Sequence, residues 1–140
     1  MSESATGFLV SPRAYRNFEM NLDFMPDETV NSGILIGCKD PNSINLDNCY
    51  EINIWDDHPN QEFRTGAIVL HGSPPLTQIE SKTKWNSYRI TFHDKRIIVW
   101  LNEQLTAETI SAEPRSGFVA LQSIGGKVQF RNLKIKRIKK

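Results

Sequence analysis

The 140-residue sequence has little of what marks a metal-binding, nucleic-acid-binding or membrane protein. Two cysteines are too few for a disulfide framework or a cysteine-rich zinc site. Lys and Arg number 17 against 16 Asp and Glu, and a net charge of +1 gives no reason to expect nucleic acid or an anionic membrane as partner. No apolar run approaches the roughly 20 residues that span a bilayer.

The first residues also lack a targeting signal. Residues 1–7 have neither a basic start nor an apolar stretch, so no signal peptide is expected and the polypeptide as given is predicted to be cytoplasmic. Hydrophobic residues make up 39% and charged residues 24% of the chain, as in ordinary globular proteins. The length suits one domain, residues 1–140, with a core of its own.

The two cysteines, Cys38 and Cys49, flank a polar loop. Their strands could be neighbours, which leaves a disulfide bridge open as an alternative. We expect two small, partly buried thiols instead.

Helical periodicity is almost absent, and short alternating strands recur between turn residues. The predicted strands cover residues 7–10, 15–24, 32–38, 49–55, 67–70, 85–93, 96–101, 104–109, 117–122 and 127–138. Such a succession predicts an all-β fold, a sandwich or a barrel. Trp85 and Trp100 fall on strands rich in apolar residues, so we expect both in the core.

The strand at residues 49–55 is the most informative about function. Alternate side chains of a strand point to opposite faces of its sheet. One set suits a core: Tyr50, Ile52 and Ile54. The other is an acid, an amide and an indole in a row, an arrangement typical of a sugar-binding surface: Glu51, Asn53 and Trp55. Trp55 is the best candidate for stacking on a sugar ring.

Motifs along the chain, in unbroken order from about residue 7 to 138, resemble those of the 3-keto-disaccharide hydrolase domain family. They lie at 15–19 (YRNFE), 31–34 (NSGI), 50–56 (YEINIWD), 65–68 (TGAI), 85–88 (WNSY), 96–102 (RIIVWLN), 121–122 (LQ) and 130–135 (FRNLKI). The resemblance implies a two-sheet antiparallel β-sandwich, a concanavalin- or laminarinase-like jelly roll with a carbohydrate site on its concave sheet. It also implies activity on oxidised (3-keto) glycosides, and relatives that are mostly exported bacterial proteins.

The chain departs from the family pattern in three places. The usual N-terminal segment of the family is missing. Asn53 replaces a longer glutamine. Residues 121–125 read LQSIG where relatives tend to have LQDHG, so a histidine and an acid are absent there.

A 3-keto sugar needs modest catalytic machinery. The ketone acidifies the adjacent C–H, so one positioned base plus donors to the enolate oxygen can suffice. We predict Glu51 as the base, Arg131 as the oxyanion donor and His71 as the acid. The predicted substrate-binding residues are Asn53, Trp55, Gln122, Glu19 and Asp56. Two alternatives stay open: Arg131 could form a structural ion pair, and His71 could be a surface histidine.

Other chemistry fits less well. The Glu51-x-Asn53-x-x-Asp56 spacing is similar to that of retaining glycosidases, which need two carboxyls about 5–5.5 Å apart. Positions five apart face opposite ways in a regular strand, so we do not expect that mechanism. Asp56, Asp57 and His58 could hold a divalent cation, but we expect a solvated turn. No metal or cofactor is predicted.

The sequence thus predicts a carbohydrate-active jelly roll, with a hydrolase or lyase acting on 3-keto glycosides as the first interpretation. Whether it is an enzyme stays open. A non-catalytic carbohydrate-binding module is one alternative, and a structural sandwich that self-associates as a homodimer is another. The expected partner is a carbohydrate, without nucleic acid or membrane.

Overall fold

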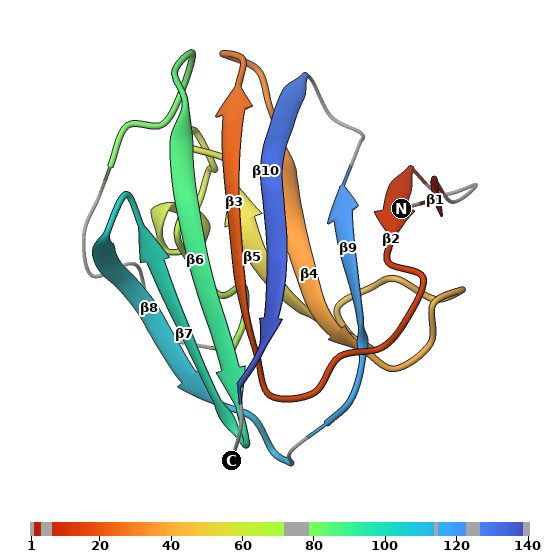
Figure 1. Ribbon diagram of the computed structural model, residues 1–140. Coiled ribbons are helices and arrows are strands. Elements are labelled where there is room, and N and C mark those ends of the chain that lie inside the picture. The colour runs from red at the N-terminus through yellow and green to blue at the C-terminus, as the bar shows by residue number, and fades with distance from the viewer. Residues whose placement is uncertain (1, 4–6, 72–78, 114, 123–126, 139–140) are drawn as a thin grey trace.

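The computed structural model describes residues 2–3, 7–71, 79–113, 115–122 and 127–138. Their strands form two five-stranded sheets that pack face to face, as Figure 1 shows. The described residues contain no α-helix and one turn of 3-10 helix, η1 (Gln61–Phe63). None of their helical segments is long and apolar enough to cross a bilayer. The predicted all-β sandwich is confirmed.

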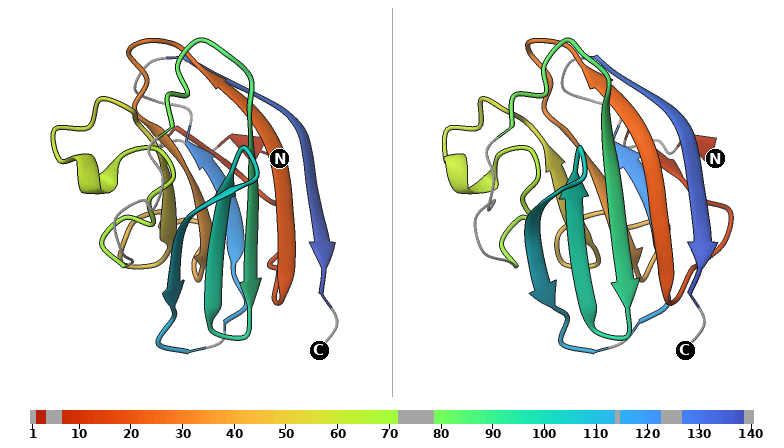
Figure 2. Two further views of the ribbon diagram at one scale, coloured as in Figure 1. Left: turned by 90° about the vertical axis from the view of Figure 1, so that its left-hand side faces the viewer. Right: turned by 60° about the vertical axis from the view of Figure 1, so that its left-hand side comes forward.

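The first sheet, called here the β5 sheet, has the order β1-β2-β9-β4-β5. Its strands are β1 (Ser2–Glu3), β2 (Phe8–Val10), β9 (Phe118–Gln122), β4 (Ser32–Cys38) and β5 (Tyr50–Ile54). Every pair within it is antiparallel. Figure 2 shows the segment around η1 beyond this sheet, on the opposite side of the sandwich from β10.

The second sheet, called here the β3 sheet, has the order β10-β3-β6-β7-β8 and is also antiparallel. Its strands are β3 (Phe18–Pro26), β6 (Asn86–His93), β7 (Arg96–Leu101), β8 (Gln104–Ile110) and β10 (Val128–Arg137). The C-terminal strand β10 therefore lies beside the early strand β3, far from it in sequence (Figure 1).

Strict alternation builds the core between the sheets. In β3 the even-numbered residues are buried, from Phe18 to Phe24, while the odd-numbered ones between them are half-buried. Ile34 and Ile36 of β4 face them from the other sheet and are fully buried. Burying an aliphatic side chain contributes about 1.5–3 kcal/mol, so this interface dominates the stability of the domain.

Nearly all predicted strands appear within a few residues of their expected bounds. The segment at 67–70 differs: it forms only an isolated bridge, Ile52 with Ile68, along the outer edge of β5. The strand expected from residue 15 begins at Phe18, because Asn17 has a left-handed φ of 51° that breaks extended pairing. The departure from the family pattern at 123–125 lies outside the described residues.

Cys38 and Cys49 form a disulfide, so the expectation of two thiols was wrong. Cys38 ends β4 and Cys49 immediately precedes its neighbour β5, which places their Cα atoms 4.3 Å apart. Both residues are buried on the outer side of the β5 sheet, against Leu35 and Ala120. The sequence spacing could not show whether the two cysteines pair, because the loop between them can place Cys49 at many positions relative to Cys38.

The expectation that Trp85 and Trp100 are core residues was also wrong. Both are half-buried. Trp100 alternates with the buried Val99 and Leu101, so its ring lies on the outer face of the β3 sheet. There the guanidinium of Arg89 lies 3.9 Å from the centre of the Trp100 ring, and that of Arg131 lies 3.7 Å from the Trp85 ring.

Candidate functional site

Glu51 lies on the outer face of the β5 sheet, as the strand pattern predicted. Its neighbours Tyr50 and Ile52 are buried in the core, and alternation turns the Glu51 side chain the other way. In the register of β4 and β5, Leu35 pairs with Glu51 and Gly33 pairs with Asn53. These side chains therefore share the outer face, called here the Glu51 face.

The missing side chain of Gly33 makes room for the Glu51 carboxyl. A Cβ atom placed on Gly33 would lie 2.5 Å from Glu51 Oε2 and 3.2 Å from the carboxyl carbon. The carboxyl thus extends across the bare backbone of β4, toward β9 on its far side. Gly33 does not have the positive φ of Gly37, so the contact with Glu51, and not backbone conformation, is what requires a glycine here.

Gln122 approaches the same bare backbone from β9. Ile34 pairs with Leu121, so the next positions, Gly33 and Gln122, lie side by side. Because Leu121 is buried in the core, Gln122 points to the Glu51 face. Its Oε1 atom is buried and has no hydrogen-bond partner in the described part of the chain. A buried amide oxygen without a donor is costly, and a ligand hydroxyl can supply that donor.

Burial raises the pKa of the Glu51 carboxyl above its ordinary value of 4.5. Desolvation is the cause, because it disfavours the charged form. The described residues donate no hydrogen bond to this carboxyl. A carboxylate of raised pKa is a stronger base than a solvated one, a property that proton-transfer sites commonly have.

Asn53 shares the Glu51 face, but both ends of its side-chain amide are bound by the protein. The amide donates to the Phe63 carbonyl at 2.5 Å, and its oxygen accepts from the backbone N–H of Ile54 at 3.1 Å. Only 4% of the residue is exposed. The structure therefore assigns Asn53 an observed role in anchoring the segment around η1, next to the candidate site.

Asp56 is a buried structural hub after the end of β5. Its carboxylate accepts from Thr65 Oγ1 at 2.5 Å, Ser81 Oγ at 2.6 Å and the Ser81 N–H at 2.7 Å. Within the described ranges no cluster of three or more His, Cys, Asp or Glu residues could hold a metal ion.

Trp55 lies past the last residue of β5 that pairs with β4. Its ring packs against His58, with the two centres 4.2 Å apart. It lines a small hollow of about 170 Å³ together with Val30 and Lys82. The structure thus places Trp55 in a hollow whose lining does not include Glu51.

His71 contacts the opposite side of β5 from Glu51. Its ring packs edge-on against Tyr50, with centres 4.7 Å apart, and Tyr50 is a core residue. The His71 carbonyl also accepts a hydrogen bond from Thr109 Oγ1.

Arg131 and Glu19 lie on the other sheet altogether. Arg131 Nε forms an ion pair with Asp23 at 3.3 Å, and Glu19 forms one with Arg89 at 3.8 Å, both on the outer face of the β3 sheet. Glu51 and Arg131, predicted as the base and the oxyanion donor of one site, lie on different sheets, because β10 pairs with β3 instead of joining the β5 sheet. The structural ion pair kept as the alternative for Arg131 is what the structure shows.

Of the predicted residues, the structure brings together Glu51 and Gln122, with Asn53 beside them. Gly33 completes the group and was not predicted. One sequence signal could have identified Gly33. It is a glycine on the non-core side of a central strand, next to a strand that carries an acid.

Comparison with known proteins agrees with this architecture. The sequence model of a family described as the 3-keto-alpha-glucoside-1,2-lyase-like domain matches residues 1–136. A candidate glycosyl hydrolase from Parabacteroides distasonis is 27% identical, with a TM-score of 0.78; the match covers 98% of this chain and 89% of that chain. No significant match is found among curated proteins.

More distant structures share the fold alone. A second candidate glycosyl hydrolase from Parabacteroides distasonis is 20% identical with a TM-score of 0.84, over 98% of this chain and 79% of that chain. The carbohydrate-binding module CBM66 from Bacillus subtilis is 14% identical with a TM-score of 0.69, over 96% of this chain and 89% of that chain.

Proposed function

The chain belongs to the family of 3-keto-alpha-glucoside-1,2-lyase-like domains, and on this premise we propose that it binds a glycoside on the Glu51 face and cleaves its 3-keto form. The observation that carries the proposal is the half-buried Glu51 carboxyl above Gly33, beside the unpartnered Gln122 Oε1. The similarity to candidate glycosyl hydrolases supports the same substrate class.

In the proposed reaction Glu51 acts as the general base. Its carboxylate takes the proton from the carbon beside the ketone, and the bonding electrons move onto the ketone oxygen as an enolate. When the ketone re-forms, these electrons make a new C=C bond and expel the glycosidic oxygen from the next carbon. The leaving alcohol takes its proton from water, so the elimination needs no oxidant.

Gln122 is proposed to hold the sugar. Its amide oxygen accepts from a sugar hydroxyl, which removes the cost of leaving that oxygen unpaired. The absence of a side chain at Gly33 lets the ring approach the backbone of β4 beside the carboxyl. His71 and Arg131 take no part in this version, because they contact other faces of the sandwich.

The test is turnover of 3-keto glucosides by wild type and by Glu51→Gln. Loss of a general base lowers rates by about 10²- to 10⁴-fold, while sugar binding should persist. Glu108→Gln is the matched control, because Glu108 is an exposed carboxylate of β8 that pairs with Arg96. Equal rates for the wild type and Glu51→Gln would refute the role of Glu51.

A non-catalytic carbohydrate-binding module is the second candidate function. It is favoured because Arg131 and His71, the predicted oxyanion donor and acid, do not lie beside Glu51. Saturable sugar binding without product release, lost in Gln122→Ala, would support that reading over the enzyme.

A further inference from the structure

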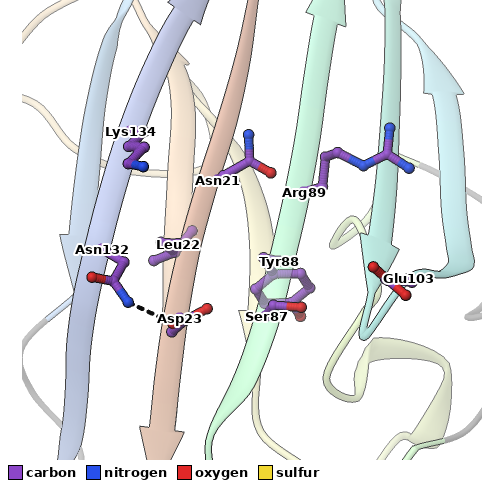
Figure 3. Close-up of a pocket in the computed structure, with 9 residues that line it drawn as sticks. All are labelled: Asn21, Leu22, Asp23, Ser87, Tyr88, Arg89, Glu103, Asn132 and Lys134. Carbon is purple, nitrogen blue, oxygen red and sulfur yellow. Dashed lines mark hydrogen bonds between the residues drawn. The ribbon is translucent and has the colours of Figure 1, made fainter.

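The outer face of the β3 sheet carries a hollow of about 640 Å³. Figure 3 shows the residues that line it. It is lined by β3, β6 and β10 and by the turn between β7 and β8, through Asn21, Leu22, Asp23, Ser87, Tyr88, Arg89, Glu103, Asn132 and Lys134. Ligand sites commonly occupy about 300–1,000 Å³. The Glu51 face belongs to the other sheet, so this hollow is a separate place on the molecule.

Its polar side chains stand in two rows across neighbouring strands (Figure 3). One row follows the register of β10, β3 and β6: Lys134, Asn21 and Arg89. The second contains Asn132, Asp23 and Ser87. Two residues along a strand span about 7 Å, and adjacent strands are about 4.8 Å apart. The floor between the rows is the backbone of Leu22 and Tyr88, whose side chains are buried in the core.

Contacts among the side chains hold this polar surface in place. Asp23 Oδ2 accepts from Asn132 Nδ2 at 2.9 Å and from Arg131 Nε at 3.3 Å. Arg89 is fixed by its stacking on Trp100 and by Glu19. Within the described ranges no donor is assigned to Asp23 Oδ1, which leaves this oxygen for a ligand. Fixed groups bind with a smaller entropic cost than free surface side chains.

Asn132 reaches the hollow through a local irregularity of β10. The register of β10 against β3 shifts between Arg131 and Lys134, and Asn132 has a φ of 57°. A β-bulge of this kind redirects a side chain, and residues other than glycine adopt a positive φ at some energetic cost. Because of the bulge, the side-chain amide of Asn132 lies against the carboxylate of Asp23.

The charges that line the hollow cancel. Arg89 and Lys134 balance Asp23 and Glu103, so neither an anion nor a cation is favoured by net charge. Carboxylate, amide, hydroxyl and ammonium groups together offer both donors and acceptors at fixed spacing. A neutral molecule with several hydroxyls matches this pattern, because each hydroxyl donates and accepts.

We propose that this hollow on the β3 sheet is a second, non-catalytic binding site for a neutral oligosaccharide. It would hold a sugar chain on the side of the sandwich away from Glu51. The proposal does not depend on turnover at the Glu51 face, and the two sites can fail separately.

The test is an NMR titration of the full chain with maltotriose, cellotriose and laminaritriose. The reporters are the side-chain amides of Asn21 and Asn132 and the indole N–H groups of Trp85 and Trp100. We expect at least one sugar to shift these signals saturably. Asn132→Gly keeps the positive φ and removes the amide, so it should fold and bind about tenfold more weakly, the loss of one good hydrogen bond.

Two controls make the test specific. Lys136→Ala changes the same strand outside the hollow and should leave binding unchanged, and Glu51→Gln should not affect these signals. The proposal is overturned if no trisaccharide shifts the reporters, if the shifts survive Asn132→Gly unaltered, or if glycine betaine, a zwitterion, shifts them equally well.

Discussion

Gly33 and Glu51 show how one missing side chain can set the position of a carboxyl. The Glu51 side chain occupies the space that any larger residue at position 33 would take. Because the atom in the way is the end of a flexible side chain, the fold can tolerate a methyl group there, while the carboxyl has to move. Glycine is thus needed at position 33 to position the Glu51 carboxyl, and not to maintain the fold.

Gly33→Ala is therefore expected to keep the melting temperature within a few degrees and to lose most activity on 3-keto glucosides. The shorter acid in Gly33→Ala/Glu51→Asp should recover part of it, because it avoids the new methyl group. Gly117→Ala is the contrasting control: its Cβ would lie 2.3 Å from the Gly37 backbone, and we expect unfolding or a loss above about 2 kcal/mol. Full activity of Gly33→Ala would contradict the positioning role.

Glu51 should also make stability depend on pH. Its folded-state pKa is raised, so the folded protein binds the proton more tightly than the unfolded chain, and stability falls as pH rises through that pKa. Glu51→Gln should consequently melt higher than wild type at neutral pH and equally below pH 4.5, the ordinary value. Turnover should rise over the same range in which the wild type loses stability, since the base must be ionised. Parallel melting curves of the two proteins at all pH values would exclude a raised pKa.

At the scale of elements, the strands were predictable because their signal is local. Alternation of period two in β3 and β5 identified both the strand and its buried face, and the apolar run of β4 identified a central strand. Trp85 and Trp100 were misplaced because residue type was given more weight than alternation. The segment that follows β5 was not predictable, because a carboxylate, Asp56, organises it through contacts distant in sequence.

Asp56→Ala is expected to destabilise the domain by about 3 kcal/mol, because Thr65 and Ser81 lose a charged acceptor in a buried place. The measurement is chemical denaturation. The adjacent Asp57→Ala removes an exposed carboxylate that pairs with Lys82 at 2.9 Å and should cost less than about 1 kcal/mol. Similar losses of unfolding free energy in both variants would mean that the buried contacts of Asp56 contribute no more than an exposed ion pair.

For the molecule as a whole, the sandwich carries polar groups on both of its outer faces, and one apolar core separates them. One face carries Glu51 and Gln122, and the other carries the Asp23 and Arg89 hollow. Family membership supports a carbohydrate-related function, and the first face is our proposed site for it. The second site is argued only from its own side chains.

The Cys38–Cys49 disulfide should stabilise the entire domain, since it closes a loop between two adjacent strands. Reduction, or Cys38→Ala/Cys49→Ala, is expected to lower the free energy of unfolding by about 2–3 kcal/mol. Equilibrium unfolding with and without dithiothreitol measures this. Identical unfolding curves would show that the bridge is absent in solution.

Disulfides of this kind are typical of oxidising compartments. We therefore propose that the protein works in such a compartment, which differs from the cytoplasmic location expected from the sequence.

Local patterns were enough to establish most strands, the resemblance to the family and the position of Glu51 on a non-core face. Which outward-facing side chains share a sheet was settled only by the fold. Arg131 pairs with Asp23, 108 residues away, and so belongs to the sheet opposite Glu51. Side-chain alternation depends on the chain's own geometry over a few residues, whereas strand pairing depends on how distant segments bury the shared core, and no local pattern encodes that choice.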